Sequence, residues 1–439
     1  MGVIPRLTNE PGALETAAQI RAGELTSLEA VDAAIARIEA LDGALNAVVV
    51  RDFDRARETA RRMTSPAADQ PLFGVPMTVK ESFDIAGLPT CWGLPEHAGY
   101  RPERDAVAVQ RLKRAGAVIV GKTNVPPMLA DWQATNPVYG RTVNPHDAER
   151  SPGGSSGGSA AALASGMVPA EYGSDIGGSI RVPAHFSGVW GHKPTYGVIS
   201  SDGQLFPGTD GHDIALAVVG PLARNGEDLA ALFEATWDRP LPASPKPLSE
   251  CRFLYLADHP LVPCDDAVRA PIAAAVAAIE EAGAAVDHRS DLLPDLVAQH
   301  TAYMPMLNIA LFMGGPGPDG KVASAADWFK LLDTQRRFQR AWDDLFEEYD
   351  FVLAPPAALA AFPHDERPLP ERLWTINGAD YPAAAVLAYA GIATFPLLPA
   401  TVLPVGSAGR LPVGIQVIGN RYRDRDTIAA ATAIGELLV

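Results

Sequence analysis

The most unusual segment of the sequence is Gly153-Gly154-Ser155-Ser156-Gly157-Gly158-Ser159, followed directly by the mostly apolar residues 160–166. A second Gly/Ser segment, residues 173–181, reads Gly-Ser-Asp-Ile-Gly-Gly-Ser-Ile-Arg. A Gly/Ser run is often a flexible linker, but the apolar residues that follow at once predict a loop held against a core helix. A Walker phosphate loop would end in Gly-Lys-Ser/Thr, and this stretch contains no Lys.

Both segments contain serines that could act as a nucleophile. The first matches Gly-x-Ser-x-Gly twice, but a run of only Gly and Ser meets that pattern by chance. In the second, Gly177 and Gly178 allow the backbone to aim its N–H groups at one point before Ser179. Such donors stabilise the oxyanion that forms when a serine attacks a carbonyl. A base is still needed, and Lys80 at the end of an apolar strand would be neutral if desolvated away from carboxylates.

Six ordered stretches together resemble the amidase signature family over nearly the whole chain. They are Gly74-Val75-Pro76-Met77-Thr78-Val79-Lys80, Gly121-Lys122-Thr123-Asn124, residues 153–159, residues 173–181, Gly191-His192-Lys193-Pro194-Thr195 and Leu411-Pro412-Val413-Gly414-Ile415-Gln416. The spacing of 75 residues from Lys80 to Ser155 and of 24 from Ser155 to Ser179 also agrees with the family pattern. The resemblance is densest in residues 71–196, the expected signature core of a single domain spanning residues 1–439.

The resemblance implies amide hydrolysis through an acyl-enzyme, with Ser179 as nucleophile, Ser155 as proton carrier next to a cis peptide bond, and Lys80 as base. It also implies no metal and no organic cofactor. The implied oxyanion hole consists of the backbone N–H groups of Ile176, Gly177, Gly178 and Ser179.

Several residues near these motifs are candidates for supporting or binding roles. Asp175 and Arg181 flank the nucleophile turn, and we expect them to hold it through polar contacts. The resemblance places Leu129, Asp131 and Trp132 where relatives line the substrate pocket, although Leu129 and Trp132 are equally compatible with plain core positions. A carboxylate of Asp131 facing that pocket would favour a cationic substrate, but a solvated or paired Asp131 is an equal alternative. The resemblance gives Lys122 a structural part, and the apolar run 309–313 could add to the pocket wall.

A histidine base is the main alternative for the chemistry. His185 and His192 follow Ser179 closely, so a Ser-His-Asp arrangement is possible on composition. We interpret both as packing residues because Lys80 already fills the base position. The sequence has neither an HExxH motif nor a Cys/His cluster with metal-ligand spacing, so no metal is expected.

The branch of the family follows from departures at two positions. The glutamine-hydrolysing subunits of tRNA-dependent amidotransferases usually have Thr where Ile176 stands and Gln where Val182 stands. Together with residues 135–145, this favours a stand-alone amidase, on the side of fatty acid amide hydrolase, acting on a small or apolar amide and on esters. The alternatives are a catalytically dead binding module and an amidotransferase subunit working in a complex. The acyl and amine preferences depend on segments 199–213, 303–320 and 374–382, which we interpret as loops without a motif.

The periodicity of the remaining chain predicts an α/β fold, with a mixed central β-sheet covered by helices on both faces. Thr26 and Glu29 form a possible capping box before a helix reaching Leu41. Further helices are expected at residues 106–115, 265–282 and 427–438. Strands are expected at residues 47–50, 73–80, 118–120, 253–256, 284–287, 351–354 and 413–418. The Pro-rich stretches 240–249 and 363–370 are expected to be surface loops.

Composition excludes several classes of partner. The chain has 439 residues, 47% of them hydrophobic, and a formal net charge of −16, so we expect no nucleic-acid partner. No apolar run is long enough to span a bilayer, and the first 12 residues do not resemble a signal peptide. The three cysteines form no CxxC pair, which fits a reducing compartment. We therefore expect a cytoplasmic enzyme with a small-molecule amide substrate, and leave a homodimer open.

Overall fold

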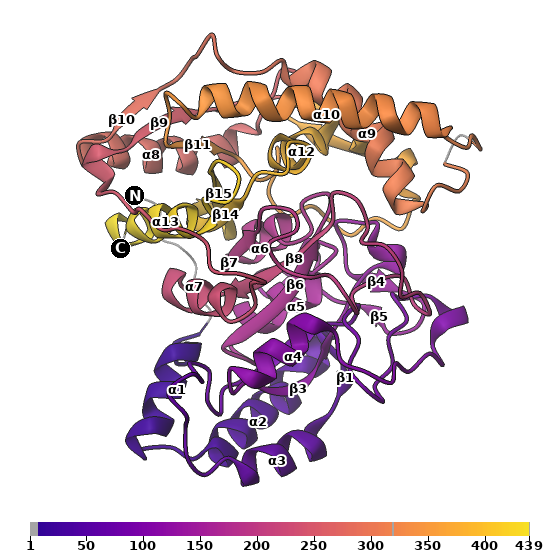
Figure 1. Cartoon of the computed structure of the whole chain (residues 1–439), viewed down its shortest axis with the longest axis vertical. Helices are drawn as coiled ribbons and strands as arrows, with labels where there is room; N and C mark the ends of the chain where they lie inside the picture. Colours follow the sequence, from indigo (N-terminus) through magenta and orange to yellow (C-terminus); the bar gives the residue numbers. More distant parts are fainter. Residues whose placement is uncertain (1–7, 318–319, 439) are drawn as a thin grey trace.

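A mixed β-sheet runs through the whole molecule (Figure 1). The structure is a computed structural model that describes residues 8–317 and 320–438, so the opening segment is described only from residue 8 onward. Within these residues the main sheet has 11 strands. In spatial order they are β1 (Val48–Arg51), β3 (Val118–Thr123), β2 (Pro76–Lys80), β6 (Ala170–Asp175), β8 (Val218–Ala223), β7 (Trp190–Lys193), β14 (Ala400–Ala408), β15 (Leu411–Ile418), β11 (Phe351–Ala354), β9 (Arg252–Tyr255) and β10 (Ala285–Asp287).

The strand directions alternate between parallel and antiparallel blocks. Strand β2 is parallel to both β3 and β6, and β9 is parallel to both β10 and β11. The strands between these blocks, from β6 through β8, β7, β14 and β15 to β11, pair antiparallel. The prediction of a mixed central sheet is therefore confirmed. Because β6 and β15 belong to one continuous sheet, we infer that the chain folds as one domain.

Helices cover both faces of this sheet, as predicted. They are α1 (Ala13–Ala22), α2 (Ser27–Leu45), α3 (Phe53–Arg62), α4 (Val107–Arg114), α5 (Gly157–Ala164), α6 (Arg181–Ser187), α7 (Gly226–Glu234), α8 (Asp266–Glu281), α9 (Leu296–Leu311), α10 (Ala325–Leu345), α11 (Ala383–Val386), α12 (Ala388–Thr394) and α13 (Asp424–Leu437). Short 3-10 turns are η1 (Pro95–His97), η2 (Pro127–Leu129), η3 (Leu248–Glu250) and η4 (Leu369–Glu371), and two small hairpins are β4 (Thr135–Asn136) with β5 (Gly140–Arg141) and β12 (Leu373–Ile376) with β13 (Ala379–Pro382).

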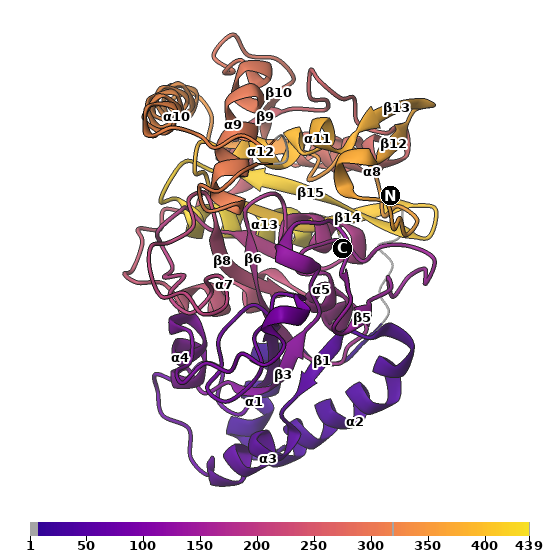
Figure 2. The same cartoon turned by 90° about the vertical axis from the view of Figure 1, so that its right-hand side faces the viewer.

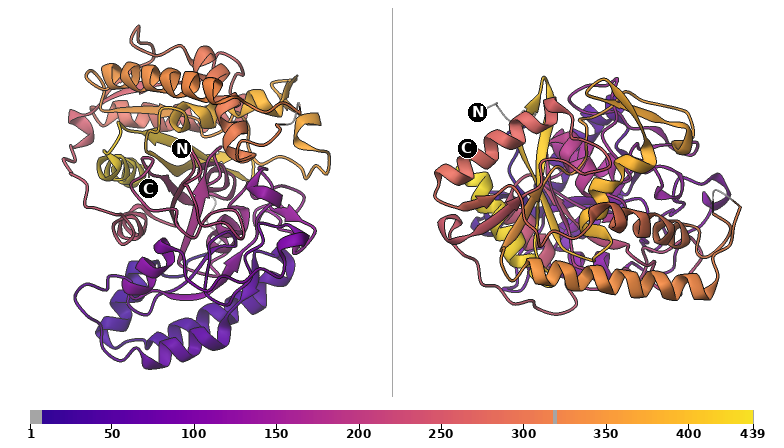
Figure 3. Two further views of the ribbon diagram at one scale, coloured as in Figure 1. Left: turned by 45° about the vertical axis from the view of Figure 1, so that its right-hand side comes forward. Right: turned by 90° about the horizontal axis from the view of Figure 1, so that it is seen from above.

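The two faces can be assigned from neighbouring residues of one strand. Successive side chains of a strand point to opposite faces. Val402 packs with Ile180 and Ala184 of the α6 region, whereas the next residue, Leu403, approaches Gly435 of α13. Helices α5 and α6 therefore share one face, and α13 lies on the other. In Figure 3 the long helix α10 runs along one side of the upper part of the molecule.

Glycine and alanine let α5 approach the sheet closely. A Cβ atom on Gly158 would lie 2.3 Å from the backbone N of Asn124, so only glycine allows this spacing. All residues of α5 are buried. The Gly/Ser stretch 153–159 is therefore the entrance of a core helix, as expected, and not a linker.

Most of the predicted elements are present. The Thr26–Glu29 capping box is formed, and the helices and strands predicted after residue 250 occur within a few residues of their expected ends. The strand predicted from residue 73 begins only at Pro76, because the chain turns at Gly74, whose φ is +76°. Both Pro-rich stretches are loops ending in short 3-10 turns.

Two segments interpreted as loops are regular structure. Residues 303–311 belong to α9, and residues 374–382 lie mostly in the β12–β13 hairpin, which Figure 2 shows beside α11. The prediction failed for α9 because its apolar side chains surround the helix, which contacts both α10 and α12, so no polar face marks its period. Residues 318–319 of this segment lie outside the described part of the chain.

Candidate active site

Lys80 lies at the end of β2 and is completely buried. Its Nζ atom is 2.6 Å from Ser155 Oγ and 2.9 Å from Ser174 Oγ. Burial lowers the pKa of Lys80 to about 7, although the carboxylates of Asp175 and Glu171 act in the opposite direction. The expectation that no carboxylate lies near this lysine was therefore wrong, but the lysine is still poised to lose its proton near neutral pH.

Ser155 is held at the entrance of α5 by an unusual backbone. The Gly154–Ser155 peptide bond is cis. A Cβ atom on Gly154 would lie 2.3 Å from the carbonyl oxygen of Asp131, so any residue other than glycine would clash with this backbone. The following N–H, of Ser156, donates to the carbonyl oxygen of Ser179 at 3.1 Å. This bond ties the two serine-bearing segments together.

Ser179 lies in the turn between β6 and α6 and is 5% exposed. The turn passes through Gly178, whose φ of +91° favours glycine. Asp175 accepts hydrogen bonds from the N–H groups of Gly178 at 2.9 Å and Ile180 at 3.1 Å. Arg181 binds the same carboxylate at 3.0 Å in a fully buried ion pair. Burial alone would raise the pKa of Asp175, but the charge of Arg181 holds it at about 2.

The carbonyl groups of the same turn are also held from outside. The Tyr303 hydroxyl donates to the carbonyl oxygen of Ile176 at 2.9 Å, and Trp132 Nε1 donates to that of Gly177 at 2.8 Å. With these carbonyls fixed, the orientation of the neighbouring N–H groups is fixed as well.

The N–H groups of Ile176, Gly177 and Ser179 have no hydrogen-bond partner within the described part of the chain. The N–H of Gly178 differs, because it already donates to Asp175. This contrasts with the expectation that all four N–H groups of the turn are available. Three unpaired donors next to a serine form a site where a negative oxygen can be stabilised.

Two cavities meet at Ser179. The first is almost entirely apolar; it is lined by Leu129, Ala130, Asp131, Trp132, Ile176, Gly177, Ser179, Leu307, Leu311, Leu369, Trp374 and Leu387. The second contains the polar groups; it is lined by Trp92, Met128, Leu129, Ser155, Ser174, Asp175, Ile176, Ser179, Gln204, Ile214, Ala217 and Leu311. The two serines therefore face a common space, although no hydrogen bond joins their side chains in this structure.

A comparison with protein-family models matches Amidase over residues 29–310 and 318–428. The chain belongs to the amidase family. Membership makes it an amide hydrolase, as the sequence predicted.

Curated relatives represent different branches of the amidase family. The chain is 31% identical to an indoleacetamide hydrolase of Bradyrhizobium diazoefficiens, with 96% of this chain and 85% of the relative covered. It is 32% identical to fatty-acid amide hydrolase 2-B of Danio rerio (98% and 90% covered) and 31% identical to a glutamyl-tRNA(Gln) amidotransferase subunit of a Roseiflexus species (92% and 92%). Among solved structures, one described as an amidase superposes with a TM-score of 0.84 at 26% identity, covering 98% of this chain and 100% of that chain.

The three predicted pocket residues of this amidase all line the first cavity. Leu129 and Trp132 are also largely buried, so each residue both lines the cavity and packs in the core. Asp131 is not a free charge, because its Oδ1 atom lies 2.7 Å from the guanidinium of Arg372, a residue that is itself buried. The predicted anionic subsite for a cationic substrate is therefore neutralised from within.

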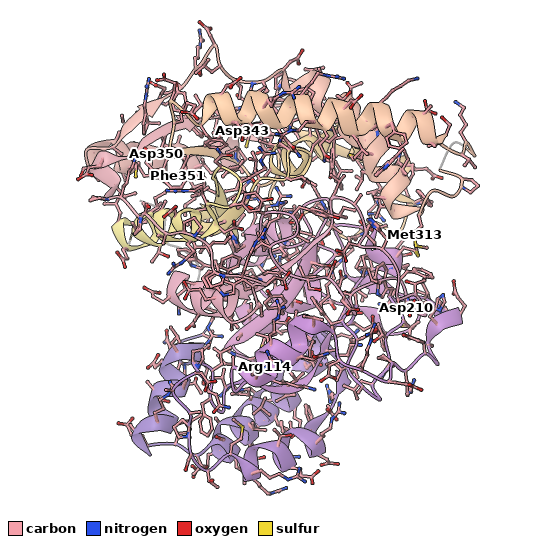
Figure 4. All side chains as sticks on the ribbon, viewed as in Figure 1. Arg114, Asp210, Met313, Asp343, Asp350 and Phe351 are labelled. Carbon is pink, nitrogen blue, oxygen red and sulfur yellow. The ribbon has the colours of Figure 1, made fainter. Side chains whose placement is uncertain are left out.

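The apolar run 309–313 contributes less wall than expected. Leu311 lines both cavities. Phe312 is 42% exposed, and Met313, labelled in Figure 4, lies past the end of α9 and is 56% exposed. The helix ends at Leu311, so the following side chains turn outward.

The two histidines of the amidase are engaged elsewhere, as we interpreted them. His185 Nδ1 accepts from the N–H of Gly414 at 2.7 Å, and burial lowers the pKa of this ring to about 4. His192 contacts Thr401 at 2.9 Å and Asp424 at 3.3 Å. Lys122 donates to Thr90 Oγ1 at 2.8 Å and to the Pro89 carbonyl oxygen, which fits a structural role.

Sequence reasoning missed three polar residues around Lys80. Ser174 Oγ receives hydrogen bonds from Lys80 and, at 3.2 Å, from Gln204, which also binds Ser82 at the same distance. Glu171 is the third. Ser174 lies inside the 173–181 motif and could have been found there, but nothing in the sequence distinguishes Gln204 or Glu171 from surface residues.

Two further properties concern partners of the amidase. Among the described residues no group of three or more His, Cys, Asp or Glu side chains is arranged to hold a metal ion. No helix in the described ranges is both long and apolar enough to cross a membrane.

Proposed function

We propose that the chain hydrolyses a carboxamide through an acyl-enzyme on Ser179, with Ser155 as proton relay and Lys80 as base. The observation that supports this most is the 2.6 Å contact between Lys80 Nζ and Ser155 Oγ in a buried site, where the pKa of the lysine is about 7. A neutral amine there can accept a proton from the serine hydroxyl, which a fully charged ammonium cannot do.

Acylation begins when Ser179 Oγ attacks the carbonyl carbon of the amide. The proton of Ser179 passes to Ser155 Oγ, and the proton of Ser155 passes to Lys80 Nζ. The carbonyl oxygen becomes an oxyanion, which the N–H groups of Ile176, Gly177 and Ser179 stabilise. When the C–N bond breaks, Ser155 protonates the leaving nitrogen and regains a proton from Lys80.

Deacylation uses the same groups with water as nucleophile. Ser155 and Lys80 take one proton from the water as its oxygen attacks the acyl carbon. The ester bond to Ser179 then breaks, Ser179 regains a proton, and the carboxylic acid leaves. The Ser155–Ser179 hydrogen bond that both steps need forms, in this proposal, once substrate occupies the site, since catalytic hydrogen bonds are often longer in free enzymes.

The two cavities supply a proposed orientation of the substrate. The leaving nitrogen must accept its proton from Ser155, which lines only the second cavity. The amine side therefore occupies the second cavity and the acyl side the first. Because the first cavity is apolar and its single carboxylate is paired, we propose an uncharged, apolar or aromatic acyl group. Esters of the same acids should react as well, since their leaving group is easier to expel.

A role as an amidotransferase subunit is the second candidate, favoured by the relative from Roseiflexus. Ile176 and Val182 depart from the pattern of that branch, and the first cavity has no free charge for the polar side chain of glutamine. The complete Lys80, Ser155 and Ser179 set argues against a catalytically dead binding module.

The test is covalent labelling of the purified chain with a fluorophosphonate probe, followed by peptide mapping. Label on Ser179, lost in Ser179→Ala and retained in the control Ser165→Ala outside both cavities, is the expected result. The same chain is then assayed, without any partner, on aryl, fatty, aliphatic and amino-acid amides and on glutamine with and without charged tRNA. Label on Ser156 with an active Ser179→Ala variant, or glutamine turnover that requires a partner and tRNA, would overturn the proposal.

A further inference from the structure

Glu171 is a fully buried carboxyl without an ion-pair partner among the described residues. Its Oε2 atom accepts a hydrogen bond from the N–H of Tyr172 at 2.9 Å. Its Oε1 atom is buried and has no hydrogen-bond partner in the structure. A buried carboxylate is costly unless a positive charge or hydrogen bonds compensate it. The position therefore calls for a function, in contrast to Asp175, which Arg181 fully satisfies.

The surroundings of Glu171 join it to the strand that carries Lys80. Met77 pairs in parallel with Ala170, which brings Thr78 beside Glu171. Thr78 and Lys80 are two residues apart, so their side chains leave β2 on the same face. The hydroxyl of Thr78 is also buried and unpaired.

The Glu171 cluster is completed from two further elements. Thr123 of β3 and Ser159 of α5 contribute hydroxyls that lie 2.9 Å from each other. These hydroxyls and that of Thr78 lie close enough to lower the pKa of Glu171, yet none makes a well-formed hydrogen bond to Oε1. Neither Glu171 nor these three residues line the cavities at Ser179. The cluster therefore sits behind the reacting groups and does not touch the substrate.

The charged groups that face one another here are few. Lys80, from β2, faces Asp175 and Glu171 of β6, and both carboxylates favour its protonated form. Asp175 is committed to Arg181 and also interacts with Lys193, whereas Glu171, within the described part of the chain, faces Lys80 and the neutral hydroxyls of β2, β3 and α5. Burial raises the pKa of Glu171 to about 7, the value to which burial lowers that of Lys80. Because the two groups interact, the charge of one affects the protonation of the other, and they titrate as one coupled unit.

Building on the function proposed above, we propose that Glu171 is a positioning residue whose carboxylate stabilises the ammonium that Lys80 becomes each time it takes the proton of Ser179 through Ser155. No proton has to reach Glu171 in this step. When it is ionised, the carboxylate supplies an opposite charge in a fully buried site, where such an interaction is stronger than in solvent. The proton stored on Lys80 is then available for the leaving nitrogen.

The test is Glu171→Gln, which keeps the shape of the side chain and removes its charge. We expect kcat to fall by about tenfold, in the range by which general-base catalysis contributes, with KM unchanged because Glu171 lines neither cavity. The acid limb of kcat/KM should move to lower pH by about one unit, because an opposite charge near Lys80 is lost. Glu171→Asp should return the limb toward its wild-type position. Glu81→Gln is the matched control, since this buried carboxylate instead accepts hydrogen bonds from the N–H groups of Cys91 and Trp92 and should leave the limb in place.

A purely structural role for Glu171 would give a different result. Glu171→Gln would then lower the melting temperature but leave both the acid limb and the kcat-to-KM relationship unaltered, and this would overturn the proposal. If Glu171→Gln does not fold, the rate of fluorophosphonate labelling against pH is measured in Glu171→Ala, which also removes the charge, and an unshifted limb there has the same meaning. Failure of the proposed function is detected separately, in protein that keeps Glu171. It would appear as an absence of label on Ser179, or as activity that survives in a Lys80→Met variant.

Discussion

Trp132 and Trp374 stack face to face, with ring centroids 5.4 Å apart and planes only 6° from parallel. The first ring follows the 3-10 turn η2 in the N-terminal half, and the second belongs to the β12–β13 hairpin. Trp132 also fixes the carbonyl of Gly177 beside the nucleophile. The stack therefore links the wall of the apolar cavity directly to the turn that carries Ser179.

Truncating Trp374 to alanine should impair large acyl groups selectively. The variant loses one wall of the first cavity, while the groups around the carbonyl carbon are unchanged. We expect kcat/KM for an aryl-acyl amide to fall by about tenfold or more, in the range that apolar pocket contacts discriminate, with little change for the acetyl analogue. Rate measurements on the two substrates check this. Trp237→Ala serves as control, because the Trp237 ring packs against Arg425 outside the cavity. An equal loss of kcat/KM on both substrates in Trp374→Ala would contradict the prediction.

Activity should rise with pH as the site passes through about pH 7, because Lys80 must be neutral to act as base and its pKa lies at about 7. This acid limb of the pH–activity profile reports the coupled titration of Lys80, Ser155 and Ser179 together, not the pKa of one residue. Lys80→Arg should lose about 10²–10⁴-fold in kcat, since arginine does not release its proton at these pH values. An active Lys80→Arg, or loss of activity in His185→Ala without loss of fold, would indicate a histidine base instead.

The Asp175–Arg181 pair should stabilise the fold above pH 4. Arg181 holds the pKa of Asp175 at about 2, below its ordinary value of 3.8, so this stabilisation is lost as the pH falls through that interval. At pH 7, Asp175→Asn should reduce the free energy of unfolding by about 3–5 kcal/mol, because it leaves Arg181 buried without its partner. Urea unfolding at pH 7 and pH 3 measures both effects.

Asp365 provides the matched comparison for that experiment. A hydrogen bond from Arg367 lowers its pKa to about 2 as well, but the Arg367 side chain is 57% exposed. Asp365→Asn should therefore cost at most about 1 kcal/mol. Equal losses in the two variants would show that burial does not decide the strength of the Asp175 pair.

Removing Arg372 should create the cation preference that the wild type lacks. Arg372→Met leaves the carboxylate of Asp131 unpaired at the wall of the first cavity, so amides with an ammonium on the acyl side should gain relative to neutral analogues. The double variant Arg372→Met/Asp131→Asn should lose this gain. Competition between one cationic and one neutral substrate of equal size measures it, and a cation preference already present in the wild type would disprove our account of Asp131.

Local patterns were enough to predict much of the fold. The strand at Phe351–Ala354 is a short, continuous apolar run, and the helix Asp266–Glu281 has regular periodicity. Thr26 and Glu29 mark a helix start through contacts three residues apart. Helix α9 was not predicted from the sequence, because its apolar residues lie on all sides of the helix. In such segments the period is hidden, and only the neighbours in space reveal the structure.

The candidate site shows the same division. Glycines 177 and 178 and the spacing of Lys80 could be read in the sequence because these features are contiguous or ordered. The Arg372–Asp131 ion pair could not be predicted from the sequence, because its two residues lie far apart in the chain. In the structure their opposite charges compensate each other, whereas in the sequence each residue is simply a charged side chain. The burial of Glu171 is likewise a product of packing by α5, β2 and β3, and no local signal marks it.

The stacked tryptophans also separate two tasks along the chain. Residues 80–181 contain every group that we propose to move a proton or hold an oxyanion, whereas much of the acyl wall comes from residues 307–387. Exchange of the β12–β13 hairpin and of the end of α9 would then alter the acyl specificity, while Lys80, Ser155 and Ser179 stay unchanged. A library limited to these later segments, with Trp374 kept, would explore new substrates while preserving the stack that supports the turn of Ser179.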